Sequence, residues 1–555
     1  CRICDPRGRV EGSPRRGTDM IRQSLPQKRL FFAPRAGFVL LLSGCAWMPP
    51  GGDRAEFQEP PPMERTLSQA SRQEPLAPLN AWPDDQWWRQ FKSPDLDRIM
   101  EIALRRNPGL KKEYARLSET DAVAQVEGSR LLPWLDSDNT FRQLRYAKHG
   151  VVAAYKPTLG GTEKTSDTFN PVSIRYEFDF WGKNRAALEA ALGEATAEEA
   201  ELAETRLLLT TAIARSYIGG ATFAQELTLI RDMVKVRRQS LNVAKTRFHT
   251  GLGPADAIVQ ASVDLENDVR LEASTRLLLI TQQNLLARLM GEGPDTTQNL
   301  FAGERISIPA RISLPARLPI ELLAHRPDLA AAMYRAEATA KRIHVAKAQF
   351  LPSVDLTAAT AGLEASVATK SIGTLPGLLF RGSDLNYLVA PGFHLPLFEG
   401  GRLRGQLAVA RSQYDEAVEL YNDTLLHAVQ EVADSLTDWK QTRSILKVHS
   451  DLLNSTRHEV GLTQMRQRTG LNDQREILTI QHGLLDQQFA LKASEADHLI
   501  AAVDLIQAMG GGYSNGIDLS RPQLAPEQGL SGLETLTPAW SFETLAPTLL
   551  PFFRN

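Results

Sequence analysis

Two residues with catalytic potential stand close together in the segment "HRPD" (325–328). His325 and Asp328 are three positions apart, so on a helix their side chains would share one face, as a proton-transferring pair requires. Pro327 lies between them, and proline is favoured in the opening turn of a helix. We therefore interpret this segment as the start of a helix and not as a catalytic dyad.

The other residue types with chemical potential form no recognisable site. The ten histidines are scattered, without an HExxH pattern or the spacing of metal ligands. The chain contains no P-loop, no GxSxG and no GxGxxG after an expected strand. A net charge of −2 gives no electrostatic basis for nucleic-acid binding. We expect a protein that is not an enzyme, needs no cofactor or metal and binds no nucleic acid.

The first 45 of the 555 residues hold all three cysteines, Cys1, Cys4 and Cys45. Several basic residues precede "AGFVLLLSG" (36–44), an apolar run too short to cross a bilayer. That order is typical of a signal peptide, which we assign to residues 1–44, with Met20 as an alternative start of translation.

The stretch "LLSGC" resembles the lipobox of bacterial lipoproteins, in which the cysteine carries a covalent lipid. The resemblance implies a lipid on Cys45, which would anchor the chain without a spanning helix; the alternative is a chance cysteine after a signal peptide. Ala46 at the next position implies, by the same resemblance, passage to the outer membrane. Residues 45–80 are rich in Pro, Gln and Glu, and we expect an extended tether there.

The chain repeats itself at a nearly constant offset. Matches at an offset of 219 are Leu132-Pro133 with Leu351-Pro352, "RFHTGL" (247–252) with "RQRTGL" (466–471), and Met290-Gly291 with Met509-Gly510. Trp181 and Arg185 match Phe398 and Arg402 at an offset of 217. These matches indicate two copies of one unit, roughly 95–291 and 320–510.

Each copy predicts the same order of elements: a helix, two strands, a very long helix, a glycine-containing turn and a returning helix. The predicted first helices are 95–130 and 322–349, the strands 134–146, 171–180, 353–361 and 387–397, and the long helices 183–249 and 402–468. At 1.5 Å per residue the long helices reach about 100 Å, so two helices of about 54 Å laid end to end match one of them. Their charges exclude membrane spans, and helices of such length are typical of coiled coils or helical repeats.

The segment "PVSIRYEFDFWGKNR" (171–185) predicts a strand with one apolar and one polar face. The apolar residues are Val172, Ile174, Tyr176, Phe178 and Phe180, and they alternate with Ser173, Arg175, Glu177 and Asp179. The second copy keeps Val389, Phe393, Leu395 and Leu397 in register. Such alternation is the signature of membrane strands, but four strands alone would leave open edges. Two alternatives remain: a soluble sheet, or a barrel that closes through oligomerisation.

The order and spacing of several segments resemble those of the TolC-like outer-membrane efflux proteins, and the lipobox points to their NodT-type lipoprotein branch. The segments are "YEFDFWGKNR", "LLAHRPDLAAAMYRAEATAKRIHVAKAQFLPSVDL" (322–356), "FEGGRL" (398–403), "RTGLNDQREILTIQ" (468–481) and "AMGGGY" (508–513). The resemblance covers about 80–512. It implies an α+β membrane protein of two tandem repeats, whose trimer forms a 12-stranded transmembrane barrel from four strands per protomer, continuing into a long periplasmic α-helical barrel.

The resemblance also implies function, partners and domains. The chain would be a lipid-anchored subunit of the outer membrane of a Gram-negative bacterium, extending into the periplasm. As a homotrimer in contact with outer-membrane lipid, it would be a passive exit duct for drugs or other toxic small molecules. An inner-membrane pump, of the RND type, would deliver these through a periplasmic adaptor. The domains would be the repeats 81–310 and 311–512, followed by a Pro-rich tail, 513–555. The alternative is a periplasmic coiled-coil lipoprotein scaffold without a pore.

By the same resemblance, the turns after the long helices are the periplasmic tips, where the tunnel closes and the adaptor docks. The tip residues are Gly251, Arg466, Gly470, Asp473 and Glu476. In the family, the second turn and the helix after it often carry the pattern Gly-x5-Asp-x2-Asp. Here the glycine is Gly470, Glu476 stands at the position of the first acid, and Thr479 replaces the second. Glu476, with Asp473, would form a ring of carboxylates that attracts cations; the alternative is that both are solvated charges. In the barrel, residues 172, 174, 176, 178 and 180 would face lipid, Arg175, Glu177 and Asp179 the lumen, and Trp181 the membrane interface.

Overall fold

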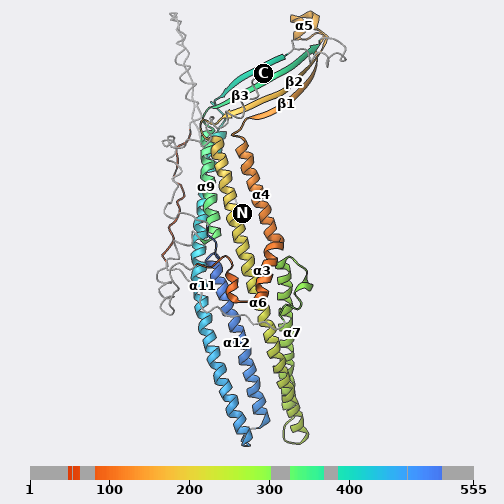
Figure 1. Cartoon of the computed structure of the whole chain (residues 1–555), viewed down its shortest axis with the longest axis vertical. Helices are drawn as coiled ribbons and strands as arrows, with labels where there is room; N and C mark the ends of the chain where they lie inside the picture. Colours follow the sequence, from red (N-terminus) through yellow and green to blue (C-terminus); the bar gives the residue numbers. More distant parts are fainter. Residues whose placement is uncertain are drawn as a thin grey trace, which may run out of the picture.

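The computed structural model describes residues 48–52, 54–62, 82–301, 325–367, 385–471 and 473–514. The described chain is long and narrow, with a sheet at one end and two helical hairpins reaching the other (Figure 1). Cys45, the expected signal peptide 1–44 and the tail beyond residue 514 lie outside the described residues.

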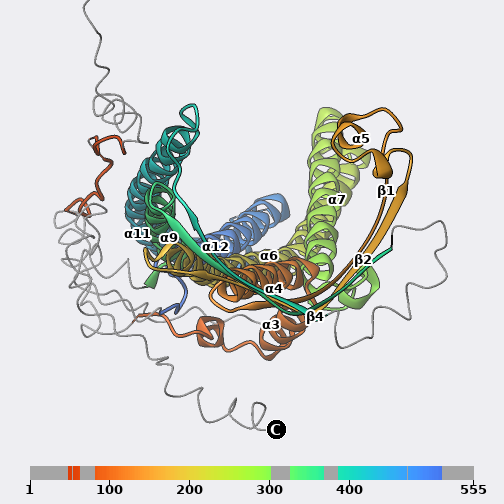
Figure 2. The same cartoon turned by 90° about the horizontal axis from the view of Figure 1, so that it is seen from above.

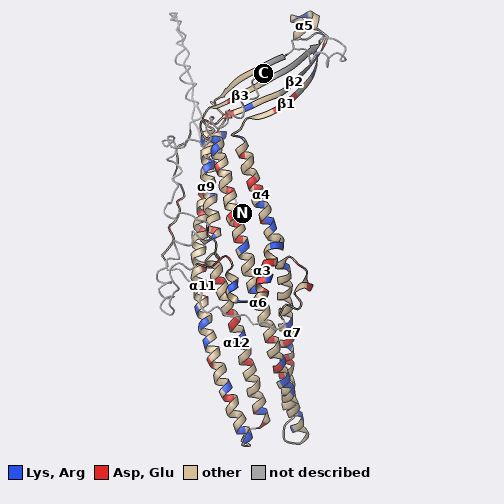
Figure 3. Ribbon diagram, in the orientation of Figure 1, with Lys and Arg blue, Asp and Glu red and all other residues tan. Residues whose placement is uncertain are grey.

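Two helices of 67 residues run through the molecule, α6 (Lys183–His249) and α11 (Arg402–Arg468), with the bounds that the sequence predicts. Each turns back into a helix of 35 residues, α7 (Asp256–Met290) after α6 and α12 (Gln474–Ala508) after α11. Charged residues are spread along all four helices (Figure 3). Among the described residues, no helix is both long and apolar enough to cross a membrane.

Shorter helices complete the half of the molecule next to the sheet: α3 (Pro94–Arg106), α4 (Pro108–Ser129) and α9 (Pro327–Ala348). The single helix predicted over 95–130 was wrong. Pro108 has no N–H to continue α3, and the Asn107 side chain accepts a hydrogen bond from the Leu110 N–H at 3.0 Å, which starts a new helix. The short elements are η1 (Trp87–Phe91), α5 (Val151–Tyr155), η2 (Pro157–Leu159) and η3 (Pro294–Thr297).

The helices stand side by side in a curved wall with one concave side (Figure 2). Near the sheet the neighbours follow the order α4, α6, α9, α11, and toward the tips α7, α6, α12, α11. Small residues let α6 and α9 approach closely, since a Cβ added at Gly193 would lie only 3.1 Å from the Cβ of Ala338. The largest apolar core lies midway along the wall, where η1 and α3 pack on α6, α7 and α12.

The sheet has four antiparallel strands in the order β1 (Trp134–Arg145), β2 (Glu163–Phe178), β3 (Ser353–Val367) and β4 (Leu385–His394). All four predicted strands are present, with some bounds wrong. β2 begins eight residues earlier than predicted, and β3 ends six residues later. In these added parts polar and apolar residues do not alternate in the sequence. The strands continue because their backbones pair, for example Thr165 with Val367, and so satisfy each other's N–H and C=O groups.

Residues 48–62, where described, form neither helix nor strand and are bound to α11. Arg54 forms an ion pair with Asp415 (Nη1–Oδ2, 3.0 Å), and Asn422 exchanges hydrogen bonds with Gln58 N–H and Glu56 C=O. Further contacts join Arg411 to the carbonyls of Pro49 and Pro50, and the ring of Phe57 to that of Tyr421. We call these residues the strap; it runs parallel to α11, starting from the end near the sheet.

Candidate functional site: sheet and helical tips

The register of the sheet sorts its side chains into an apolar and a polar face. Residues directly opposite one another share a face. The rows on the apolar face are Leu135, Ile174, Ala358 and Val389; Tyr176, Leu356 and Pro391; and Phe178, Val354 and Phe393. The other face carries Asp136 and Ser173, Arg175 and Thr357, Glu177 and Asp355, and Ser353 and His394. Leu135, Val389 and Phe393 are each more than 60% exposed, so the apolar face is largely uncovered in one chain.

Four of the five residues predicted for the apolar face lie in β2, and Phe180 lies two residues beyond its end. Phe180 nevertheless continues the aromatic column, because its ring stacks on that of Phe178 with centroids 5.7 Å apart. The predicted strand 387–397 likewise stops early, so Leu395 and Leu397 follow β4. Pro396, which has no N–H, lies between these two leucines.

The polar residues at the end of β2 organise the turn into α6. The Asp179 carboxylate accepts hydrogen bonds from the N–H groups of Asn184 (3.1 Å) and Arg185 (2.9 Å), and Glu177 pairs with Lys183. Asp179 therefore satisfies open N–H groups at the start of a helix, a role that the sequence analysis did not foresee. Trp181 donates from its indole N–H to the Pro352 carbonyl at 2.6 Å.

At the opposite end of the molecule, the two long helices finish in the same way. The N–H of Leu252 bonds to the Arg247 carbonyl at 2.7 Å, and that of Leu471 to the Arg466 carbonyl at 2.8 Å. Gly251 and Gly470 have φ of 73° and 76°, which completes a Schellman motif at each tip. Arg466 and Glu476 are exposed there.

Asp473 is held by several partners and is not a free carboxylate. It caps α12 by accepting from the N–H groups of Arg475 (2.8 Å) and Glu476 (3.3 Å), and it pairs with the Arg475 guanidinium at 2.8 Å. The hydrogen bond from Arg475 is the main cause that lowers the pKa of Asp473. Arg247 of α6 approaches it at 3.5 Å, so Asp473 also joins the two hairpins. The structure thus brings Asp473 to Arg247, a partner that sequence reasoning missed.

A second polar cluster links the hairpins above the tips. His482 of α12 lies 2.8 Å from Asp268 of α7 (Nε2–Oδ2), and Arg237 of α6 contacts both Asp268 (3.5 Å) and Asp264 (3.2 Å). The side chains of His482 and Asp268 are nearly buried. Nothing in the spacing of these residues indicated the cluster, because they lie on three helices. Among the described residues, no group of histidine, cysteine and acidic side chains could hold a metal ion.

The "HRPD" segment begins α9, as predicted, with Pro327 in its first turn. His325 contacts the Tyr513 carbonyl at 2.9 Å and stacks on Trp82, whereas Asp328 pairs with Arg326 at 2.6 Å. Arg326 also pairs with Glu431 of α11 at 2.8 Å and donates to the Ala508 carbonyl at the end of α12. The segment ties three helices together.

Comparison with known proteins agrees with this architecture of long hairpins ending in a sheet. The model of the family described as "Outer membrane efflux protein" matches residues 99–292 and 318–511. The two matched segments begin 219 residues apart, the offset found in the sequence. The chain belongs to the outer membrane efflux protein family, and its function is that of an outer-membrane efflux channel.

Individual relatives extend over most of the chain. It is 26% identical to the probable efflux pump outer membrane protein TtgC of Pseudomonas putida, over 86% of this chain and 94% of the relative. It is 27% identical to the multidrug resistance outer membrane protein MdtP of Escherichia coli, over 88% and 97%. The crystal structure of the outer membrane protein VceC of Vibrio cholerae matches with a TM-score of 0.67 and 29% identity, covering 78% of this chain and all of VceC.

Proposed function

We propose that three copies of this chain form the passive outer-membrane duct of a tripartite efflux system. The three sheets close into one 12-stranded barrel in the outer membrane of a Gram-negative bacterium, and the curved walls close into a periplasmic tunnel. Residues 81–310 and 311–512 are the two repeats from which each subunit is built. The apolar face, including residues 172, 174, 176 and 178, contacts lipid, and Phe180 lies at its margin.

The observation that carries this proposal is a two-faced sheet with two open edges. Within the described sheet, β1 and β4 each pair on one side only, and unpaired edges are not stable in a bilayer. The exposed apolar face matches lipid, and the polar face matches water. Joining β4 of one copy to β1 of the next satisfies both edges, and three copies supply 12 strands.

The strap supports the proposed lipid anchor on Cys45. The Pro50 carbonyl accepts a hydrogen bond from Arg411. Arg411 is nine residues after the start of α11, so this contact lies about 14 Å along the helix from its end near the sheet. The five residues from Pro50 back to Cys45 span up to about 17 Å when extended. A lipid on Cys45 therefore reaches the level of the sheet, where the membrane surface would lie.

The tips carry the remaining roles. The exposed leucines of the two turns, Leu252 and Leu471, suit docking of a periplasmic adaptor, and an inner-membrane pump of the RND type supplies the energy. Glu476 is exposed and lies in the first turn of α12, which Asp473 caps. We choose Glu476 for the acidic ring at the closed pore. Relatives named for resistance to fusaric acid, for multidrug resistance and for toluene efflux suggest small toxic organic molecules as the exported class.

Conductance across planar bilayers tests the duct. Purified protein should run as a trimer in detergent and give discrete channels, and the double variant Asp473→Ala, Glu476→Ala should conduct more. A monomer or dimer that stays soluble once Cys45 is replaced, with no conductance from either form, would instead establish the coiled-coil scaffold.

The anchor has its own test. Cys45→Ala should abolish incorporation of radiolabelled palmitate and leave the trimer intact. Labelling that persists in this variant would refute the assignment of the lipid to Cys45.

A further inference from the structure

The two junctions between the sheet and the long helices expose the same pair of residue types. Phe180, before α6, is 62% exposed, and Phe398, before α11, is 83% exposed. The third residue of each helix is an exposed arginine, Arg185 in α6 and Arg404 in α11. These arginines are 219 residues apart, the offset of the sequence repeat, so each copy of the repeated unit places an aromatic residue and then a cation at this end of the wall.

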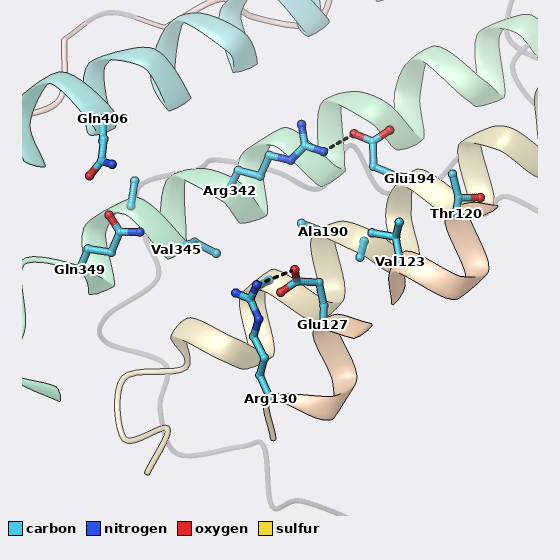
Figure 4. Close-up of a pocket in the computed structure, with 13 residues that line it drawn as sticks. Thr120, Val123, Glu127, Arg130, Ala190, Glu194, Arg342, Val345, Gln349 and Gln406 are labelled. Carbon is cyan, nitrogen blue, oxygen red and sulfur yellow. Dashed lines mark ion pairs between the residues drawn. The ribbon is translucent and has the colours of Figure 1, made fainter. Parts of the chain in front are cut away.

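Arg185 and Arg404 differ from other cations nearby in having no carboxylate partner. Neither guanidinium forms an ion pair or a hydrogen bond within the part of the chain that the structure describes. Asp179, the carboxylate next to Arg185 in the junction, is occupied by two backbone N–H groups. The neighbouring basic residues are paired: Arg130 with Glu127, Arg342 with Glu194, Lys183 with Glu177, and Arg402 with Glu399. Figure 4 shows the first two of these pairs. At each junction one arginine therefore keeps all its donors for an external ligand.

Both arginines lie on the outer side of the helical wall. Arg404 is seven residues, or about two turns, before Arg411, so the two share a face of α11. Arg411 donates to the strap, which lies outside the arc of helices (Figure 2). Ala203 is 18 residues, or about five turns, after Arg185, so these two share a face of α6. Ala203 lines a pocket together with Trp87 of η1, and η1 packs beside α3, outside the arc (Figure 2).

The level of the two arginines matches that of a membrane surface. Each is the third residue of its helix, so it lies about 3 Å beyond the start of that helix. The headgroup layer on one side of a bilayer is about 5–7 Å thick. The exposed apolar face of the sheet continues to the first junction, because the ring of Phe180 stacks on that of Phe178. Aromatic residues at a membrane boundary lie at the headgroup level, and long basic side chains reach outward to the phosphates.

We propose that the two junctions bind the headgroups of anionic phospholipids in the periplasmic leaflet of the outer membrane, one lipid at each junction. The guanidinium of Arg185 or Arg404 donates two N–H groups to a phosphate, which its planar fork matches. Phe180 or Phe398 contacts the adjoining acyl chains. Continuity of the junctions with the apolar face of the sheet favours a lipid over a free phosphate. The proposal rests on the proposed function, because the junctions meet a membrane only if the sheet spans one.

Native mass spectrometry of the purified full-length protein tests this with dioleoylphosphatidylglycerol, an anionic lipid, and dioleoylphosphatidylcholine, a neutral one. The wild type should bind the anionic lipid about fivefold more tightly, which is the effect of one arginine on an anionic lipid surface. The double variant Arg185→Gln, Arg404→Gln should bind both lipids equally. Lysine at both positions should keep the preference, because lysine keeps the charge. Glycerol phosphate, a headgroup without acyl chains, should not compete.

The double variant Arg238→Gln, Arg468→Gln is the matched control. It removes one exposed arginine from each long helix, neither of which forms an ion pair among the described residues, about 80 Å and about 96 Å farther along the helices. It should bind lipid like the wild type. Equal affinity of the wild type for both lipids, an equal loss in the control, or competition by glycerol phosphate would each overturn the site.

Conductance of the same preparations separates this lipid site from the duct itself. Normal channels from a protein that binds both lipids equally would overturn the lipid site and leave the duct standing. The expected lipid pattern without conductance would support the lipid site and overturn the duct. If the double variant at the junctions does not assemble, Arg404→Gln alone decides: it should bind half as many anionic lipids tightly as the wild type, and an unchanged number would refute the site.

Discussion

The two hairpin tips share one way of ending a helix and differ in how they start the next. Gly251 and Gly470 complete the same Schellman motif after α6 and α11. After the first turn, α7 begins at Asp256, and the preceding residue, Ala255, provides no side-chain cap. After the second, Asp473 caps α12 and also contacts Arg247 of the first tip.

This difference shows which part of a turn the geometry of the backbone dictates. The Schellman motif at the end of α6 and α11 needs a residue with positive φ, and glycine accepts this conformation without strain. Starting a helix has several solutions, because water can satisfy exposed N–H groups as a side chain does. The second tip has a carboxylate that both caps α12 and joins the hairpins. The first tip has no such cap and is held locally, by the Arg247 guanidinium donating to the Leu252 carbonyl at 3.0 Å.

The largest effect is expected at Glu226 of α6, which is buried at the contact with α12. Burial, followed by the charge of Asp497, raises the pKa of Glu226 to about 7. Its ordinary value is 4.5, so its stabilising contribution is complete below about pH 4.5 and is lost as the pH rises through 7. Glu226→Gln should therefore stabilise the protein at pH 8, by at most about 3 kcal/mol, and not at pH 4.5.

Thermal unfolding of Glu226→Gln and of the wild type at pH 8 and pH 4.5 measures this stabilisation as a shift in melting temperature. Asp497→Asn should act in the same direction at pH 8 but more weakly, because the charge of Asp497 is the smaller of the two causes. An equal shift in melting temperature at pH 8 and pH 4.5 would contradict the assigned pKa.

The next effect concerns the cap that only the second tip possesses. Asp473→Ala removes the cap of α12 and its ion pairs, with an expected loss of about 2 kcal/mol of local stability. Hydrogen exchange of residues 474–478 should accelerate by a factor of about 30. Asp256→Ala, in the first turn of α7, is the control and should change exchange there less than about fivefold. Similar acceleration in both variants would remove the proposed difference between the tips.

The two glycines should behave alike, because both tips share one geometry. Gly251→Ala and Gly470→Ala should each cost about 1 kcal/mol, since each residue would be forced into positive φ, and no neighbouring atom blocks the new Cβ. Exchange of the last turns of α6 and α11 reports each loss separately. Costs that differ by more than about twofold would show that the two turns are not equivalent in solution.

The smallest effect is expected from replacing Arg247, and it should differ from that of replacing Arg466, the residue at the same position in the second repeat. Arg247→Ala loses the contact with Asp473, worth at most about 1 kcal/mol for a partly exposed pair, and Arg466→Ala should change nothing measurable. Exchange of α12 at low salt should detect the difference, and 1 M NaCl should abolish it. A difference that persists in high salt would indicate packing of the Arg247 side chain instead of its charge.

Much of the fold could be predicted because its determinants are local. The bounds of α6 and α11 follow from uninterrupted helix-forming residues between glycine turns, and the repeat locates the second copy of each element. The break at Asn107 was missed although proline is disfavoured in a helix interior, so Pro108 already marked it; the Asn107 side-chain cap then starts the second helix. The far parts of β2 and β3 were missed because their pairing, and not their own alternation, makes them strands.

The sequence by itself determined the helix lengths, the turns at Gly251 and Gly470, and the alternation of β2, since each depends on residues that are neighbours in the chain. Only the tertiary structure decided which charges meet. Asp473 and Arg247, like His482 and Asp268, are more than 200 residues apart in sequence, and their pairing depends on how α6, α7 and α12 pack. The same holds for the strap on α11 and for the two junctions between the sheet and the helices. Both depend on separate segments, which only the packed wall of helices brings to one place.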